Sequence, residues 1–154
     1  MVTLYAYTKI IDKVTTHTLR LPDAPQGQQA AQELCTLPDG RTVVALFDGH
    51  TLPANQPAAI AASIETLPSP LPDALKEQIK QSSPHVRLIG QNMIDKIRAV
   101  YSLDDEMYFA RIGVGAATGM YTPSASELAE MTAFGSFVEG VRNWGRAERA
   151  KLGL

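Results

Sequence analysis

The uneven distribution of proline most constrains the fold of this 154-residue chain. Seven of its ten prolines lie between Pro22 and Pro70, whereas helix-forming residues dominate the second half. The string LPSPLP at 67–72 should be extended, because each residue before a proline is pushed out of the helical region. We therefore expect an α+β protein with a small antiparallel β lobe at 1–66, a proline-rich linker at 67–72 and a helical hairpin or bundle at 73–154.

Short strand-like segments occupy the first part. Val2–Thr8 alternates two sets of side chains that both suit a pleated sheet. Lys13–Leu21 is rich in β-branched residues, and we expect it to pair with Val2–Thr8 through a turn near Asp12. The residues Pro-Asp-Gly at 38–40 separate two strand-like runs and predict a hairpin. The segment AAIAASIETL at 58–67 is compatible with a short helix or a surface strand.

The second part is helical. The sequence predicts helices at residues 72–81, 84–101, 102–111 and 123–152. Ser83 and Thr122 are the expected N-caps of the second and fourth helices, each followed by proline. Ser102 opens the third helix with a sequence that resembles a capping box. Gly153 provides the stop of the last helix.

Two of these helices have an apolar stripe. In the helix at 84–101 it consists of Val86, Ile89, Met93, Ile97 and Val100. In the last helix it consists of Leu128, Met131, Phe134, Val138 and Val141, widened by Phe137 and Trp144. Amphipathic helices are not stable alone in water, so we expect the stripes to pack together within one chain or between copies.

Residues of these stripes are predicted to bind either a second copy of the chain or another partner. They are Val86, Ile89, Met93, Ile97, Phe134, Phe137, Val138, Val141 and Trp144. Five of them in the last helix are expected to mediate self-association, namely Phe134, Phe137, Val138, Val141 and Trp144. We expect a homo-oligomer, because apolar helix faces suit contacts between subunits.

The segment IGVGAATGMYTP at 112–123 packs three glycines into seven residues. A phosphate-binding loop needs a preceding strand, and for nucleoside triphosphates a lysine at its end. Here the preceding residues are helical, and no lysine occurs between Lys96 and Lys151. The dinucleotide-binding spacing also fails, because Thr118 replaces the third glycine. The segment is therefore expected to be a flexible joint between two helices.

The sequence FDGH at 47–50, together with Cys35, contains the residue types of a nucleophilic relay. The Asp-Gly pair is typical of a turn, and Cys35 lies inside the predicted hairpin, which favours a turn and a core residue. The three histidines lack the spacing of a zinc site. We expect that the protein is not an enzyme and that it has no metal or cofactor site. The alternative is a small cytosolic enzyme that uses Cys35 and His50.

Charge and hydropathy limit the class of partner. The formal net charge is −2 and the isoelectric point is about 5.9, which argues against nucleic acid and anionic lipid. No run approaches the roughly 18 apolar residues of a membrane span, and the N-terminus lacks the pattern of a signal peptide. The single cysteine excludes an internal disulfide and fits folding in a reducing cytoplasm.

The sequence after residue 83 contains the stretches SPHVRLIGQNMIDKIRAVYSLDDEMYFARI and FGSFVEGVRNWGRAERAKLGL. This part resembles a helical segment of small tail-associated proteins of tailed bacteriophages and prophages, in which IR.(K/R)YS..DE…R precedes F..(F/Y)…VE..R.WG..EK..LGL. The matching residues are Ile97, Arg98, Tyr101, Ser102, Asp105, Glu106, Arg111, Phe134, Phe137, Val138, Glu139, Arg142, Trp144 and Gly145. In that family a short polar connection joins the stretches, whereas this chain has GVGAATGMYTPSASELAEM.

The resemblance implies a structural or accessory component of a phage tail, near the fibres or the baseplate. Its partners would be other tail proteins, and its location the virion tail after synthesis in the bacterial host cytoplasm. The residues agree with this, since a β lobe is able to add to another sheet or grip a protein. A tail-fibre assembly chaperone that is absent from the virion is the alternative.

Overall fold

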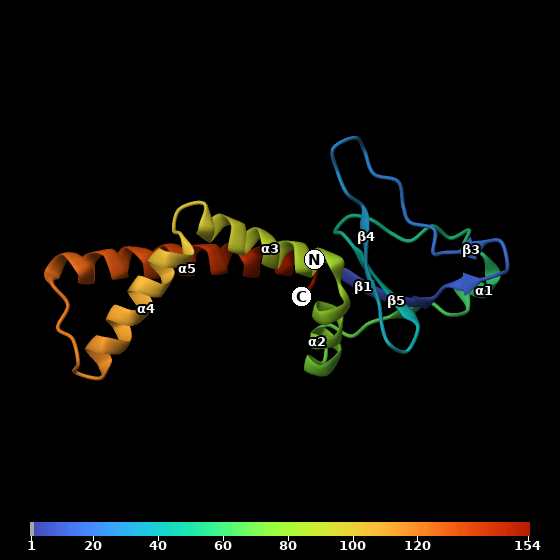
Figure 1. Ribbon diagram of the computed structural model, residues 1–154. Helices are drawn as coiled ribbons and strands as arrows, with labels where there is room; N and C mark the ends of the chain where they lie inside the picture. The colour runs from blue at the N-terminus through green and yellow to red at the C-terminus, as the bar shows by residue number, and fades with distance from the viewer. Residues whose placement is uncertain (1) are drawn as a thin grey trace. The chain divides into compact units, whose positions relative to one another are not determined.

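The computed structural model describes residues 2–154 and has the α+β fold that the sequence predicted (Figure 1). Its strands are β1 (Thr3–Thr8), β2 (Ile10–Ile11), β3 (Thr16–His17), β4 (Ala31–Thr36), β5 (Arg41–Leu46) and β6 (Glu65–Thr66). Its helices are α1 (Ala58–Ala61), α2 (Asp73–Ser82), α3 (Pro84–Arg98), α4 (Leu103–Ala117) and α5 (Ala125–Lys151). The chain divides into a first unit, up to Leu88 together with Glu148–Leu154, and a second unit, Ile89–Ala147.

A four-stranded antiparallel sheet in the order β4-β5-β1-β6 forms the centre of the first unit. The predicted hairpin is confirmed as β4 and β5. Gly40, with φ +87°, donates its N–H to Leu37 O at 2.9 Å in the turn between them. The segment at 58–67, which is compatible with helix or strand, contains both, as α1 and β6.

The predicted pairing of Lys13–Leu21 with the first strand is wrong. β1 pairs with β5 and β6, whereas β2 and β3 form a separate two-stranded hairpin. The expected turn near Asp12 does exist, since Asp12 N–H donates to Thr15 O at 2.8 Å, but it connects β2 to β3. The side chains of β5 are buried on both faces of the strand, whereas the residues of β3 are exposed. β5 therefore suits the centre of the sheet better than β3 does.

Both faces of the sheet are buried. One face packs on α2 and the C-terminal residues, in a core of Leu4, Ala6, Leu34, Cys35, Leu37, Val43, Ala45, Leu67, Ile79 and Leu154. The other face packs on α1, in a core of Tyr7, Leu19, Val44 and Ile60. The alternation of Val43, Val44 and Ala45 along β5 serves both cores, because successive side chains point to opposite faces of a sheet.

The proline-rich segment at 67–72 lies within the first unit. Leu67 is buried in the core, and its N–H donates to Leu4 O at 2.8 Å. Ile79 of α2 is fully buried against the same core. The change in composition near residue 70 therefore does not coincide with the division between the units, which falls at Leu88 inside α3.

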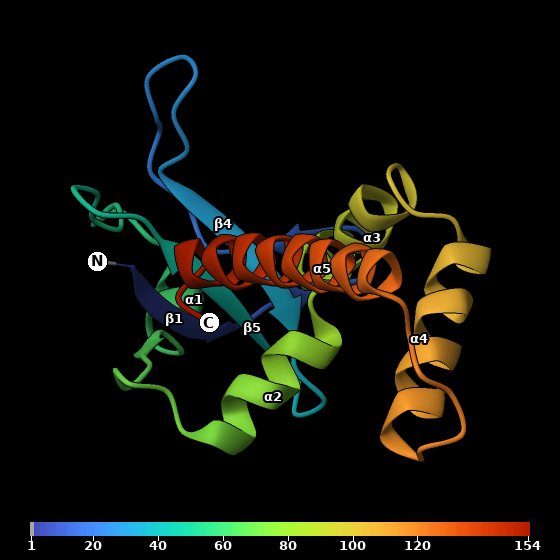
Figure 2. The same cartoon turned by 90° about the vertical axis from the view of Figure 1, so that its left-hand side faces the viewer.

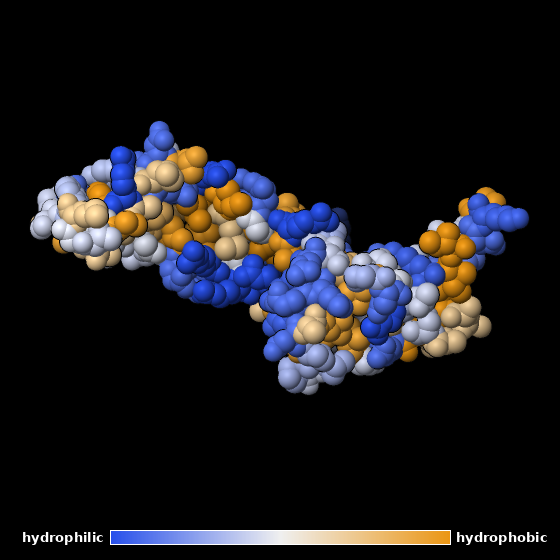
Figure 3. All heavy atoms as spheres, turned by 60° about the horizontal axis from the view of Figure 1, so that its bottom comes forward, coloured by the Kyte–Doolittle hydropathy of each residue, from blue (hydrophilic) through white to orange (hydrophobic). Residues whose placement is uncertain are grey.

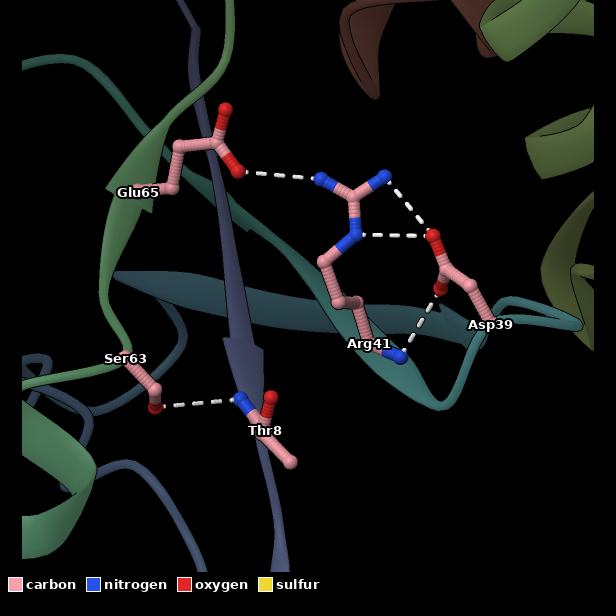
Figure 4. A network of polar contacts seen from close by, with 5 residues as sticks. All are labelled: Thr8, Asp39, Arg41, Ser63 and Glu65. Carbon is pink, nitrogen blue, oxygen red and sulfur yellow. Dashed lines mark hydrogen bonds and ion pairs between the residues drawn. The ribbon is translucent and has the colours of Figure 1, made fainter.

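Polar contacts link β5, β1 and β6 with the segments next to them (Figure 4). Arg41 of β5 donates from Nη1 to Glu65 Oε2 of β6 at 2.9 Å and from Nε to Asp39 Oδ2 in the hairpin turn at 2.8 Å. The side-chain hydrogen bond of Arg41 to Asp39, followed by that of the Arg41 backbone N–H, lowers the pKa of the Asp39 carboxyl. At the end of β1, past the two residues that pair with β6, Thr8 N–H donates to Ser63 Oγ at 3.1 Å.

The second unit contains α4 and most of α3 and α5, and α3 and α5 lie side by side (Figures 1 and 2). Gly145 is buried at their contact, where an added Cβ would overlap Met93 Sδ. An added Cβ at Gly135 or Gly140 would have no heavy atom within 4 Å. α5 continues through all three glycines, so only Gly145 is required for close packing.

The predicted helix boundaries are partly confirmed. Ser102 forms the capping box with Asp105, because each side chain accepts the backbone N–H of the other, at 3.1 and 2.7 Å. The predicted N-cap Thr122 is wrong, since Ser124 caps α5. Ser124 Oγ accepts from Glu127 N–H at 3.2 Å, and Glu127 Oε2 accepts from Ser124 N–H at 2.7 Å. Gly153, with φ +81°, follows the end of α5 as expected.

The glycine-rich segment at 112–123 is half helix and half connection: residues 112–117 are the end of α4, and residues 118–123 lie in the joint between α4 and α5. α4 ends at Ala117, and Gly119, whose φ is +72°, follows its C-cap Thr118. Tyr121 then folds back on the helix, donating its N–H to Gly115 O at 3.1 Å. A Cβ at Gly115 would lie 2.8 Å from Tyr121 Cβ, so a glycine is required at this chain reversal.

Candidate functional site: an apolar groove beside Trp144

An aromatic cluster inside the second unit contains two of the predicted interaction residues. Phe134 stacks on Phe109 of α4 with ring centroids 5.0 Å apart, and the edge of Tyr101 meets Phe134 at 5.0 Å. Phe137 lies 5.5 Å from Tyr101. These side chains therefore hold α4 and α5 together, and only the exposed parts of their surfaces are left for a partner.

The other predicted residues divide between the units. Val86 packs against the sheet core of the first unit. In the second unit Val141 is buried, and the half-buried residues are Ile89, Met93, Ile97, Val138 and Trp144. The stripe positions Val100 and Leu128 are exposed, which corrects their expected burial. For Val100 the reason is that α3 ends at Arg98, before the last predicted turn.

Three of the predicted residues come together in an open apolar groove of about 470 Å³. It is lined by Lys96, Ala99, Phe137, Gly140, Val141 and Trp144. Gly140 leaves space in the groove, because no heavy atom lies within 4 Å of the position of its missing Cβ. The periodicity of the sequence indicated the apolar residues but missed Lys96 and Gly140. The only relevant sequence signal was the low helix propensity of a glycine inside a long helix.

One charged side chain, that of Lys96, lines this groove. Lys96 Nζ lies 4.7 Å from the centroid of the Trp144 ring, an arrangement worth about 0.5–1 kcal/mol at an exposed site. Elsewhere on α5, outside the groove lining, Glu139 accepts a hydrogen bond from Arg146 Nη1 at 2.6 Å, which lowers the pKa of its carboxyl, and lies 3.9 Å from Arg142. An apolar centre with a charged side chain beside it is typical of a surface that binds another protein.

A second hollow, of about 420 Å³, lies between α4 and the start of α5. Its lining residues are Tyr108, Arg111, Ile112, Gly115, Tyr121 and Glu127. Glu127 Oε1 accepts the hydroxyl hydrogen bonds of Tyr121 and Tyr108, at 2.7 and 3.1 Å. Together with the backbone N–H of Ser124, the largest contribution, these bonds lower the pKa of Glu127 to about 2. The carboxylate is thus occupied in fixing the turn between the helices.

Acidification should loosen this turn. The pKa of Glu127 is about 2 in the folded protein, against an ordinary value of 4.5. Its stabilising contribution is therefore complete above about pH 4.5 and is lost as the pH falls towards 2. We expect Glu127→Gln to lower the melting temperature at neutral pH, and the difference from the unsubstituted protein to shrink towards pH 2.

Circular dichroism of thermal unfolding across this pH range measures the difference. Asp23→Asn is the control, because it removes an exposed carboxylate from the first unit. A deficit of Glu127→Gln that stays constant down to pH 2 would contradict the assignment.

The structure places Cys35 in the sheet core and His50 in a turn, as their sequence contexts favoured. Burial, followed by the charge of Glu33, raises the pKa of the Cys35 thiol to about 11, which makes it a poor nucleophile. His50 N–H donates to Phe47 O at 3.2 Å in a turn where Gly49 has φ +81°. Within residues 2–154 no three His, Cys, Asp or Glu side chains are grouped to bind a metal, and no helix has the length and apolarity to cross a membrane.

Comparison of the chain with protein-family models gave no match, and comparison with curated proteins and with solved structures gave none either. The resemblance to phage tail-associated proteins therefore rests on the residues of the C-terminal half. Two of those residues, Phe137 and Trp144, line the groove.

Proposed function

We propose that this chain is an accessory protein of a bacteriophage tail, and that it acts by binding another tail protein near the fibres or the baseplate. The observation that supports this most is the apolar groove with Lys96 beside the Trp144 ring. Both Phe137 and Trp144 in this groove belong to the stretch that resembles tail-associated proteins. The expected ligand is an apolar segment of the partner whose side chains occupy the space above Gly140.

A pair of glycine substitutions tests the role of the groove. Gly140→Leu should occupy part of the groove, since nothing lies within 4 Å of the added Cβ. Gly135→Leu is the matched control, because its Cβ is equally unobstructed and Gly135 does not line the groove. Each substitution should raise helix stability by about 0.5–1 kcal/mol, so neither variant loses binding through unfolding.

The measurement is mass spectrometry of purified phage particles made with each variant. We expect the unsubstituted protein and Gly135→Leu in the particles, and Gly140→Leu to be depleted from them. Equal incorporation of both variants would exclude the groove as the binding site. If the unsubstituted protein is absent from particles whose tails require it, the accessory role is wrong and the assembly chaperone takes its place.

A further inference from the structure

α4 has a second row of apolar residues, on the side away from Phe109. The row, here called the outer seam, consists of Leu103, Met107, Ala110, Val114 and Ala117. The residues are spaced alternately by four and three positions, which is the pattern of a coiled-coil seam. All five are exposed, and Leu103, Met107 and Val114 have exposed fractions of 57%, 62% and 64%.

The outer seam is not required for the fold of the second unit. Phe109 and Ile112, on the other side of α4, are buried, and Phe109 stacks on Phe134 of α5. Space-filling views show hydrophobic side chains exposed among hydrophilic ones on the helical part of the molecule (Figure 3). Within residues 2–154 no element covers the seam, so three large apolar side chains are in contact with water.

We infer that the outer seam binds the outer seam of a second copy of this chain, with the two α4 helices antiparallel. The charged residues beside the seam favour both a second copy as the partner and the antiparallel direction of the two helices. Asp104 and Arg111 lie seven residues apart, on the same flank of the seam. In an antiparallel pair Asp104 of each copy faces Arg111 of the other, and the two-fold symmetry forms this ion pair twice.

A parallel pair would be repelled at one end. α4 begins with the acidic residues Asp104, Asp105 and Glu106, and parallel helices would place both sets of three carboxylates side by side. It would also align the two helix dipoles in the same direction. Arg111 is available for the antiparallel pair, since it has no ion-pair partner within residues 2–154.

Side-chain size also fits the antiparallel register. With Met107 opposite Ala110 of the second copy, Leu103 lies opposite Val114, so the long methionine side chain meets the smallest residue of the seam. The contact is short, because the 15 residues of α4 extend about 22 Å. Such a contact buries less than the roughly 800 Å² per partner of a standard interface, so the dimer should be weak and concentration-dependent.

Sedimentation velocity from low to high micromolar concentration tests for the dimer. We expect a reversible monomer–dimer equilibrium that Val114→Asp abolishes. The control is Val14→Asp, which puts the same charge on a residue with 93% exposure in the first unit and should leave the dimer intact. A monomer at every concentration, or a dimer unaffected by Val114→Asp, would overturn the inference.

Cysteine cross-linking tests the direction. Leu103→Cys and Val114→Cys are prepared separately, mixed and oxidised; the native Cys35 is buried and does not compete. The antiparallel register places these two positions opposite each other, so a disulfide should join one copy of each variant. Disulfides that form only between identical variants would show parallel helices and overturn the inference. Circular dichroism of each variant before mixing establishes that it is folded.

Discussion

Replacing Phe109 with alanine should cost the second unit about 3–5 kcal/mol in free energy of unfolding, the usual range for a buried phenylalanine. Phe109 is 8% exposed and contacts the rings of Phe134, Tyr101 and Tyr108, with centroids at 5.0, 6.1 and 5.6 Å. The substitution removes these contacts and leaves a cavity between α4 and α5. A loss of this size is a large fraction of the roughly 5–15 kcal/mol that stabilises a folded domain.

Urea denaturation followed by the fluorescence of Trp144 measures this loss, because the single tryptophan lies in the second unit. Met107→Ala is the matched control on the same helix. Its side chain belongs to the exposed outer seam, so its loss should change the free energy of unfolding by less than about 1 kcal/mol. If both variants unfold at the same urea concentration, Phe109 is not central to the packing of the unit.

Ile79→Ala should destabilise the sheet, although Ile79 lies in a helix that the sequence assigns to the helical lobe. Its side chain is fully buried against the core that contains Leu34 and Val43. Truncation of a buried isoleucine typically costs about 2–5 kcal/mol. We therefore expect amide protons of β4 and β5 to exchange faster in the Ile79→Ala variant.

Hydrogen exchange followed by NMR detects this directly, residue by residue. Gln78→Ala, at an exposed position next to Ile79 on the same helix, is the control and should leave the exchange rates unchanged. Unchanged protection of β4 and β5 in Ile79→Ala would instead support a division of the chain at 67–72.

Features fixed by neighbouring residues could be predicted from the sequence. The hairpin of β4 and β5 follows from its turn residues, and the start of α4 follows from Ser102 and Asp105. The partner of β1 could not be predicted in this way. Several segments have the same strand tendency, and the choice among them depends on which can be buried on both faces.

The candidate groove was only partly predictable for a similar reason. Phe137, Val141 and Trp144 follow from the apolar periodicity of one helix, since that pattern selects residues for burial. The contact of Lys96 with Trp144 joins residues far apart in the sequence and requires α3 and α5 to be in place. The outer seam escaped prediction because the sequence predicts α4 only to Arg111, which omits Val114 and Ala117.

The hydrogen bonds along the outer side of β1 have a consequence for aggregation. An unpaired strand edge is a template on which strands of other chains can add, and proteins protect such edges. Leu67 N–H bonds to Leu4 O, β6 pairs with the next two residues of β1, and Ser63 accepts the N–H of Thr8. These three interactions together occupy the edge of β1, which β6 alone is too short to cover. A strand from another molecule that adds to this sheet would therefore find a longer edge at β4, with six residues, than at β6, with two.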